Sequence, residues 1–312
     1  PGAEGGKAAA RVLFGDVSPS GKLPVTFYNT LEELPDFTDY AMKGRTYRYM
    51  ENKAQFPFGY GLSYTDFEQK MGDVTVADGK VSFDVTVTNN GTAAGKDVVE
   101  VYYNPPYTNG GIEKASANLI DFAKTDVLQP GESQTINVSF SEEDMASYDT
   151  YGNGCYVLEA GDYEISINAD SHNAIESKTV SVADTVVYDE NNARSTDDAA
   201  ATNQFAYAEG DATYLSRADG FANYAKATAA PSNFTLAEDE KAEFLNNSNY
   251  DPNNYNNDSD EMPAMGADNG LQLADLTGKD YDDAVDRWLK ANAKKYDYKY
   301  EFRKCQDELK TL

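Results

Sequence analysis

The sequence predicts a mainly β protein organised around a seven-stranded β-sandwich, and three observations support this prediction. Between residues 67 and 182, apolar side chains recur at every second position, as in the row from Val81 to Val87. This period of two is typical of a half-buried strand. Tight turns are predicted between the rows at Asp78-Gly79, Asn90-Gly91, Pro130-Gly131 and Gly161-Asp162. About seven short strands in roughly 115 residues indicate two packed antiparallel sheets.

The first 66 residues predict only a small amount of regular structure. Residues 1–14 pass from glycines into an alanine-rich stretch with helical spacing, and Gly15 is placed to end that helix. Residues 16–27, DVSPSGKLPVTF, predict a turn followed by a short apolar strand. One helix and one or two strands cannot close a hydrophobic core. We therefore expect residues 1–66 to be the end of an incomplete domain with little stability of its own.

Residues 43–67 are unusually rich in aromatic rings. Arginine and tyrosine alternate within them at Arg45, Tyr47, Arg48 and Tyr49. Rings with polar tips can pack on an apolar surface while their hydroxyls reach a polar partner. The segment therefore either joins two domains or lines a polar, aromatic cleft of the kind that binds sugars. We hypothesise that these four residues lie at the rim of a sugar-binding cleft, and joining two domains is the alternative.

The strands of the sandwich can be placed in order along the chain. Tyr163 follows Gly161 at the start of the sixth strand, where a tyrosine corner is expected. The Cys…Trp…Cys pattern of immunoglobulin domains is absent, which favours the fibronectin type III-like variant over residues 67–183. The seven strands are expected near residues 67–76, 81–87, 99–103, 119–128, 136–140, 163–167 and 178–182.

The remainder of the chain has a different character. Residues 184–270 form an acidic connector rich in Asn and Asp, without a sustained hydrophobic period, and predict largely irregular structure. Aromatic residues nevertheless recur in it, so we expect the connector to lie along other parts of the protein. Residues 271–312 predict a helical end, with Val285, Trp288 and Leu289 at helical spacing.

Two stretches resemble sequences of the family-three glycoside hydrolases, which include β-glucosidases and β-xylosidases. GRTYRYM and FPFGYGLSYTDF lie within residues 44–67, and PGAEGG, VLFGD and PSGKLPVTF lie in residues 1–27. The resemblance implies that residues 1–66 end the α/β sandwich domain of that family and that the fibronectin type III-like domain follows. Residues 271–283, LQLADLTGKDYDD, resemble the lead-in to a catalytic barrel in members with reversed domain order. After Asp283 that match fades.

The composition narrows the functional classes. The formal charge of −27, from 53 acidic and 26 basic residues, argues against nucleic acid or an anionic membrane surface as a partner. No apolar run reaches the roughly 18 residues of a membrane span. Cys155 and Cys305 lie far apart, so neither a disulfide framework nor a zinc site is expected. The single histidine, His172, lies in the sequence ADSHNA, which predicts a turn between strands. We therefore do not expect His172 to act as a catalytic base. A secreted or cell-surface bacterial location is favoured over a cytoplasmic one.

The resemblance implies retaining hydrolysis of β-linked glucosides or xylosides without a cofactor. That reaction needs two carboxyl groups about 5–5.5 Å apart. In the family, the nucleophilic Asp belongs to an S-D-W type motif of the barrel, and the acid/base Glu lies earlier in the α/β sandwich domain. No S-D-W motif occurs in this chain, so we assign no catalytic residue. The expected partners are the missing barrel, the rest of the α/β sandwich domain and a β-linked oligosaccharide.

We therefore expect the chain to be a non-catalytic portion of such an enzyme, inactive alone, that scaffolds the active-site cleft. The alternative is a carbohydrate-binding or surface-attachment β-sandwich module without catalysis.

Overall fold

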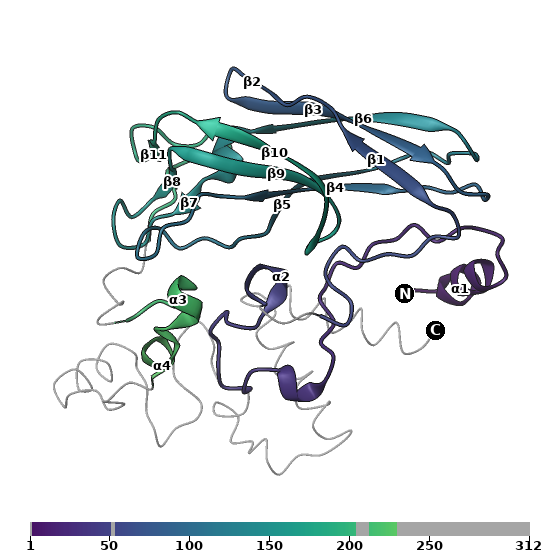
Figure 1. The fold of residues 1–312 in the computed structure, drawn as a ribbon. Helices are drawn as coiled ribbons and strands as arrows, with labels where there is room; N and C mark the ends of the chain where they lie inside the picture. The colour runs from purple at the N-terminus through teal and green to yellow at the C-terminus, as the bar shows by residue number, and fades with distance from the viewer. Residues whose placement is uncertain (1, 51–53, 204–211, 230–312) are drawn as a thin grey trace, which may run out of the picture. The chain divides into compact units, whose positions relative to one another are not determined.

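The computed structural model describes residues 2–50, 54–203 and 212–229 (Figure 1). The helical end predicted for residues 271–312 lies outside the described residues. The α-helices of the described part are α1 (Gly5–Leu13), α2 (Thr46–Tyr49), α3 (Ala218–Phe221) and α4 (Tyr224–Ala227), and its 3₁₀ helices are η1 (Leu31–Glu33) and η2 (Glu142–Met145). As predicted, α1 ends just before Gly15, whose φ of 78° leads the chain out of the helix.

The seven predicted strands are all present and form the body of a mainly β fold. They are β1 (Phe67–Met71), β3 (Lys80–Asn89), β4 (Val98–Asn104), β5 (Asn118–Lys124), β6 (Ser133–Ser141), β9 (Gly161–Asp170) and β10 (Asn173–Val182). Four shorter strands were not predicted, namely β2 (Thr75–Ala77), β7 (Ser147–Tyr148), β8 (Tyr156–Leu158) and β11 (Val186–Tyr188). The predicted first strand is interrupted after Met71, and its second half becomes β2.

Two antiparallel four-stranded sheets form the layers of the sandwich (Figure 1). In the first, β3 pairs with β1 and β2 along one edge and with β6 along the other. In the second, the strand order is β10-β9-β4-β5. A small third sheet contains β11, β8 and β7. The predicted Asp78-Gly79 pair forms the β2–β3 hairpin turn, with φ near 51° and 71° at its two residues.

The core lies between the two sheets. Val81, Val85 and Val87 of β3 are fully buried, and Ile165 and Ile167 of β9 belong to the same buried cluster. Each such side chain contributes roughly 1.5–3 kcal/mol when it leaves water. Their number makes the sandwich a self-sufficient hydrophobic unit.

The predicted tyrosine corner is confirmed. The Tyr163 side chain is 1% exposed, and its hydroxyl donates a hydrogen bond to the backbone carbonyl of Glu159 at 3.0 Å. One neighbouring prediction was wrong. Gly161 and Asp162 do not form a turn, because they open β9 and pair with the end of β10. The turn between β9 and β10 lies at Ser171 and His172, so His172 is a turn residue as predicted.

The prediction of a strand within residues 16–27 was also wrong. An isolated bridge joins Phe27 to Phe56. Nearby, the Leu23 N–H donates to the carbonyl of Tyr60, and the Gly59 N–H donates to the carbonyl of Leu23. Pro24 and Pro57 interrupt the two segments and lack the backbone N–H that a regular ladder requires. Residues 16–27 are apolar enough for a strand, but the two prolines prevent continuous backbone pairing between the two segments.

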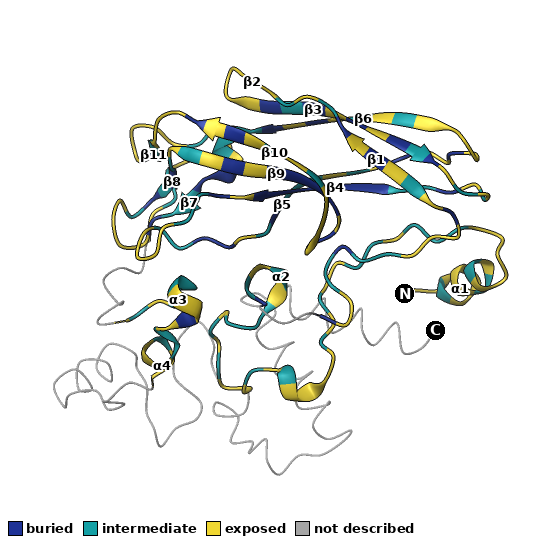
Figure 2. Ribbon diagram, in the orientation of Figure 1, coloured by how far each residue is buried: buried dark blue, intermediate teal, exposed yellow. Residues whose placement is uncertain are grey.

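Residues 2–64 bury very little apolar surface within the described part of the chain (Figure 2). Helix α1 has no buried residue. Leu31 is 81% exposed and Phe37 is 91% exposed. Of the nineteen exposed large hydrophobic residues among those that the structure describes, thirteen lie in this segment. The expectation of a segment without a core of its own therefore agrees with the observed exposure.

Candidate functional site

The arginine–tyrosine segment turns sharply, and this turn sends its side chains in different directions. Gly44 and Thr46 have φ values of 70° and 54°, and the short helix α2 follows. A β-branched residue at positive φ is unusual and marks a constrained turn. Arg45 folds back onto its own loop, where Nε donates to the carbonyl of Ala41 at 2.9 Å and Nη2 donates to the carbonyl of Asp39.

Tyr47 and Arg48 contact the β-sandwich. The Arg48 guanidinium donates to Oδ1 of Asn118, the first residue of β5, at 2.8 Å. The hydroxyl oxygen of Tyr47 accepts the backbone N–H of Leu119 at 3.2 Å. The Tyr47 ring also stacks on Phe58, with centroids 4.6 Å apart. These contacts join the N-terminal segment to β5, which is the alternative role that the sequence allowed.

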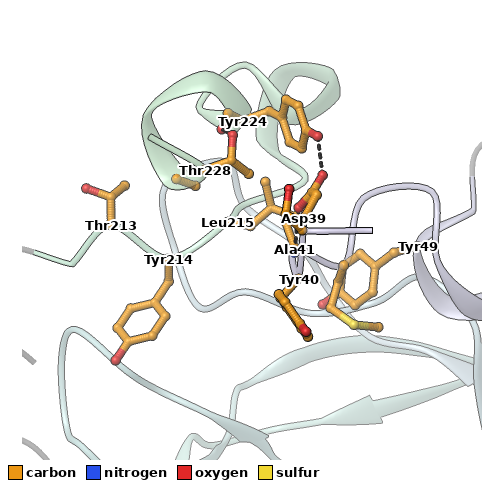
Figure 3. A pocket seen from close by; sticks show the side chains of 12 residues that line it. Asp39, Tyr40, Ala41, Tyr49, Thr213, Tyr214, Leu215, Tyr224 and Thr228 are labelled. Carbon is orange, nitrogen blue, oxygen red and sulfur yellow. Dashed lines mark hydrogen bonds between the residues drawn. The ribbon is translucent and has the colours of Figure 1, made fainter. Parts of the chain in front are cut away.

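Tyr49 points to another place, a pocket formed between residues 38–49 and residues 213–228 (Figure 3). Its ring meets Phe221 edge-on at 6.3 Å, and burial raises the pKa of its hydroxyl. The four residues of the sugar-rim hypothesis are thus not gathered around one cavity. Arg45 holds the loop, Tyr47 and Arg48 reach β5, and Tyr49 lines the pocket. Their part in substrate binding stays a prediction.

The pocket has a volume of about 660 Å³ and is lined by aromatic, hydroxyl and small side chains. Its wall is formed by Thr38, Asp39, Tyr40, Ala41, Met42, Tyr49, Thr213, Tyr214, Leu215, Tyr224, Ala227 and Thr228. Figure 3 shows that the two walls come from two distant segments, with Asp39 and Tyr224 joined across them. The volume falls within the range of about 300–1,000 Å³ that is usual for small-molecule sites.

Among the described residues, Asp39 is the one carboxylate in the wall of this pocket. The Tyr224 hydroxyl donates to its Oδ2, and the backbone N–H of Ala41 donates to its Oδ1 at 2.8 Å. The hydrogen bond from Tyr224, followed by that from Ala41, holds the pKa of Asp39 below its ordinary value. Asp39 is therefore ionised at neutral pH.

Residues 213–228 form a strap that is fastened to the sandwich as well as to the pocket. The Arg217 guanidinium lies over the Tyr107 ring at 3.6 Å, and its backbone N–H donates to Glu113. Asn109 donates to Asp219 at 2.7 Å. The expectation that connector aromatics lie along other parts of the protein is confirmed for the strap, since Phe221 packs against Tyr49.

Sequence reasoning missed Glu100, a buried carboxyl at the junction between the N-terminal segment and β4. Its side chain accepts a hydrogen bond from the Tyr102 hydroxyl at 2.9 Å and lies directly against Gly59. Burial raises the pKa of Glu100 to about 7. The signal was a single acidic residue within the apolar run VVEVYY. Glu100 is 4% exposed and lines a second, mainly apolar pocket together with Gly59.

The described residues hold no cluster of three or more His, Cys, Asp or Glu side chains arranged to bind a metal ion. No helix in the same part of the chain has the length and apolar character to cross a membrane.

Family comparisons agree with this architecture. Residues 1–64 match the glycosyl hydrolase family 3 C-terminal domain, and residues 97–171 match the fibronectin type III-like domain. Residues 1–64 and 97–171 therefore correspond to the C-terminal and fibronectin type III-like domains of glycosyl hydrolase family 3, and the chain is related to β-glucosidases and β-xylosidases.

Individual relatives support the same assignment. β-Glucosidase A of Butyrivibrio fibrisolvens is 42% identical over 52% of this chain and 23% of its own length. A xylan 1,4-β-xylosidase of Xylanibacter ruminicola is 43% identical over 53% of this chain and 19% of its own. The chain thus spans about a fifth of the length of these relatives.

Solved structures of β-glucosidases resemble a similar share of this chain. The crystal structure of β-glucosidase from Kluyveromyces marxianus has a TM-score of 0.54 and 32% identity, covering 58% of this chain and 23% of that one. A β-glucosidase from Paenibacillus barengoltzii has a TM-score of 0.52 and 38% identity, covering 59% and 22%.

Proposed function

We propose that the chain is a non-catalytic portion of a retaining glycoside hydrolase that acts on β-linked glucosides or xylosides. In this proposal the chain scaffolds the active-site cleft, and both reacting carboxyl groups belong to parts of a longer protein. Those parts are a barrel, placed after this chain in a reversed domain order, and the rest of the α/β sandwich domain. The names of the relatives and their greater length support the proposal.

The exposed apolar surface of residues 2–64 is the observation that carries this proposal. Phe14, Leu31 and Phe37 are each more than 80% exposed. Apolar surface of this extent is rarely left in water and marks an interaction site. In this proposal the occupant is the rest of the α/β sandwich domain, which is supported by the match of residues 1–64 to the glycosyl hydrolase family 3 C-terminal domain and by the greater length of the relatives.

The contacts of Tyr47 and Arg48 with β5 complete the scaffold. They fix the N-terminal segment against the fibronectin type III-like domain through side chains that reach Asn118 and Leu119. In the longer enzyme, the sandwich would hold the α/β sandwich domain in place through this junction. The sugar-rim role of Arg45, Tyr47, Arg48 and Tyr49 is a further part of the proposal.

Assays of the 312-residue chain test the scaffold proposal. We expect no hydrolysis of an aryl β-glucoside or an aryl β-xyloside and no firm retention on insoluble polysaccharide. Measurable turnover would show that reacting groups lie within this chain. Firm retention without turnover would favour the alternative, a carbohydrate-binding or surface-attachment module built on the β-sandwich.

Substitutions in a full-length family member test the sugar-rim role. Replacing the equivalents of Tyr47 and Arg48 by alanine would change KM or kcat if these side chains touch substrate. A change in thermal stability alone, with both kinetic constants preserved, would reduce their role to joining the two domains.

A further inference from the structure

We propose that the pocket between residues 38–49 and 213–228 binds one ring of a neutral saccharide. Tyr40, Tyr49 and Tyr214 line it from both segments (Figure 3). Tyrosine rings offer apolar faces to the C–H groups of a sugar, while their hydroxyls can bond to its oxygens. Threonine side chains at positions 38, 213 and 228 add further hydroxyl groups to the wall. This combination suits a ligand that is both apolar on its faces and hydroxylated on its edges.

The charges around the pocket disfavour an anionic ligand. Asp39 stands in the wall and is ionised at neutral pH, because Tyr224 and Ala41 donate hydrogen bonds to it. The wall residues that the structure describes include no lysine or arginine. The chain as a whole carries a formal charge of −27. A phosphate or carboxylate ligand would therefore be repelled by Asp39 and would find no cationic side chain among the described wall residues to bind it.

A cationic ligand is disfavoured for a different reason. The Lys43 ammonium already lies over the Tyr224 ring at 4.9 Å and near the Phe221 ring at 5.7 Å. The Arg45 guanidinium donates to the backbone carbonyl of Asp39. The Arg45 guanidinium already attracts the Asp39 carboxylate, so a second positive charge would gain less from it. A neutral polyhydroxylated ring is the remaining chemical class.

The pocket wall formed by residues 38–49 is held in place by hydrogen bonds within the chain. Arg45 fixes the carbonyls of Asp39 and Ala41, and the Tyr28 hydroxyl donates to the carbonyl of Gly44 at 2.7 Å. The Tyr40 side chain is nevertheless 86% exposed. Because the backbone of this loop is already held, binding has to order only the side chain of the exposed Tyr40 ring, which limits the entropic cost.

Binding to the 312-residue chain tests this inference with methyl β-glucoside and methyl β-xyloside as probes. Only the choice of these two sugars rests on the proposed function. We expect saturation-transfer NMR signals and a Kd on the order of 1 mM, a weak affinity of about −4 kcal/mol. Tyr40→Ala should weaken binding about tenfold, the equivalent of about 1.4 kcal/mol. Tyr40→Phe, which keeps the ring, should stay within about threefold of the parent chain.

Phe37→Ala provides the matched control, since Phe37 is 91% exposed in the same loop and does not line the pocket. It should leave the Kd unchanged. Binding of neither glycoside, or equal binding by the Tyr40→Ala chain, would overturn the inference. So would tighter binding of tetramethylammonium or inorganic phosphate than of the glycosides. None of these results depends on turnover, so loss of the scaffold proposal would leave the test intact.

Discussion

Two parts of the described chain match the family, and they differ in the burial of their large apolar side chains. Phe83 in the sandwich is 3% exposed, whereas Phe37 in the N-terminal segment is 91% exposed. In the sandwich, two sheets face each other and every inward row finds a partner. In residues 2–64, one helix and irregular loops provide no second layer. Apolar composition alone does not create a core, because burial requires two facing surfaces within the same folding unit.

The largest expected effect is on the free energy of unfolding, and it compares a buried phenylalanine of the sandwich with an exposed one of the N-terminal segment. Phe83→Ala should lower the free energy of unfolding by about 3–5 kcal/mol, because it leaves a cavity between the sheets. Phe37→Ala should change it by less than about 0.5 kcal/mol, since that ring lies in water. Urea denaturation of both variants provides the measurement. A similar loss in the two variants would mean that residues 2–64 share the core of the sandwich.

A second comparison concerns the junction between the regions. A Cβ atom at Gly59 would lie 2.1 Å from Oε2 of Glu100, and Gly59 has a φ of 83°. We expect Gly59→Ala to cost about 2–3 kcal/mol from backbone strain and the displaced carboxyl. Gly79→Ala is the control, because Gly79 has a similar φ of 71° but no neighbouring atom within 4 Å. It should cost only about 1 kcal/mol.

Equal losses in the two glycine variants, measured by thermal denaturation, would show that Gly59 and Glu100 do not press on each other. A larger loss at Gly59 would confirm close packing of the N-terminal segment against β4.

The smallest expected effect is a pH dependence from Glu100. Burial raises its pKa from 4.5 to about 7 in the folded chain. Its contribution to stability is therefore complete below pH 4.5 and is lost as the pH rises toward 7, when the buried carboxyl must ionise. Between pH 5 and pH 8 we expect a loss on the order of 1–2 kcal/mol from this group.

Glu100→Gln keeps a hydrogen-bond acceptor for Tyr102 and removes the ionisation. Denaturation of the two chains at pH 5 and pH 8 should show a smaller pH dependence for this variant, by the same 1–2 kcal/mol. An unchanged slope would indicate that Glu100 is solvated in the folded chain.

The sequence predicted the sandwich well because its signals are local. The alternation from Val81 to Val87 and the Asp78-Gly79 turn each depend on a few neighbouring residues. The junction between the N-terminal segment and β4 was harder to predict, because the contact between Gly59 and Glu100 joins residues that are distant in the chain. The pocket was not predicted at all. It depends on Tyr224 meeting Asp39, 185 residues earlier, and no periodic pattern encodes that distance.

The strap has a consequence for the order in which this polypeptide matures on the ribosome. Asp39 leaves the ribosome early, but its partner Tyr224 follows only after the whole of the sandwich has been synthesised. Domains generally fold as units while translation proceeds, at about 5–20 residues per second. The loop that carries Tyr40 therefore waits on the order of ten seconds or more for its opposite wall, and the binding cavity is completed only after the β-sandwich has emerged.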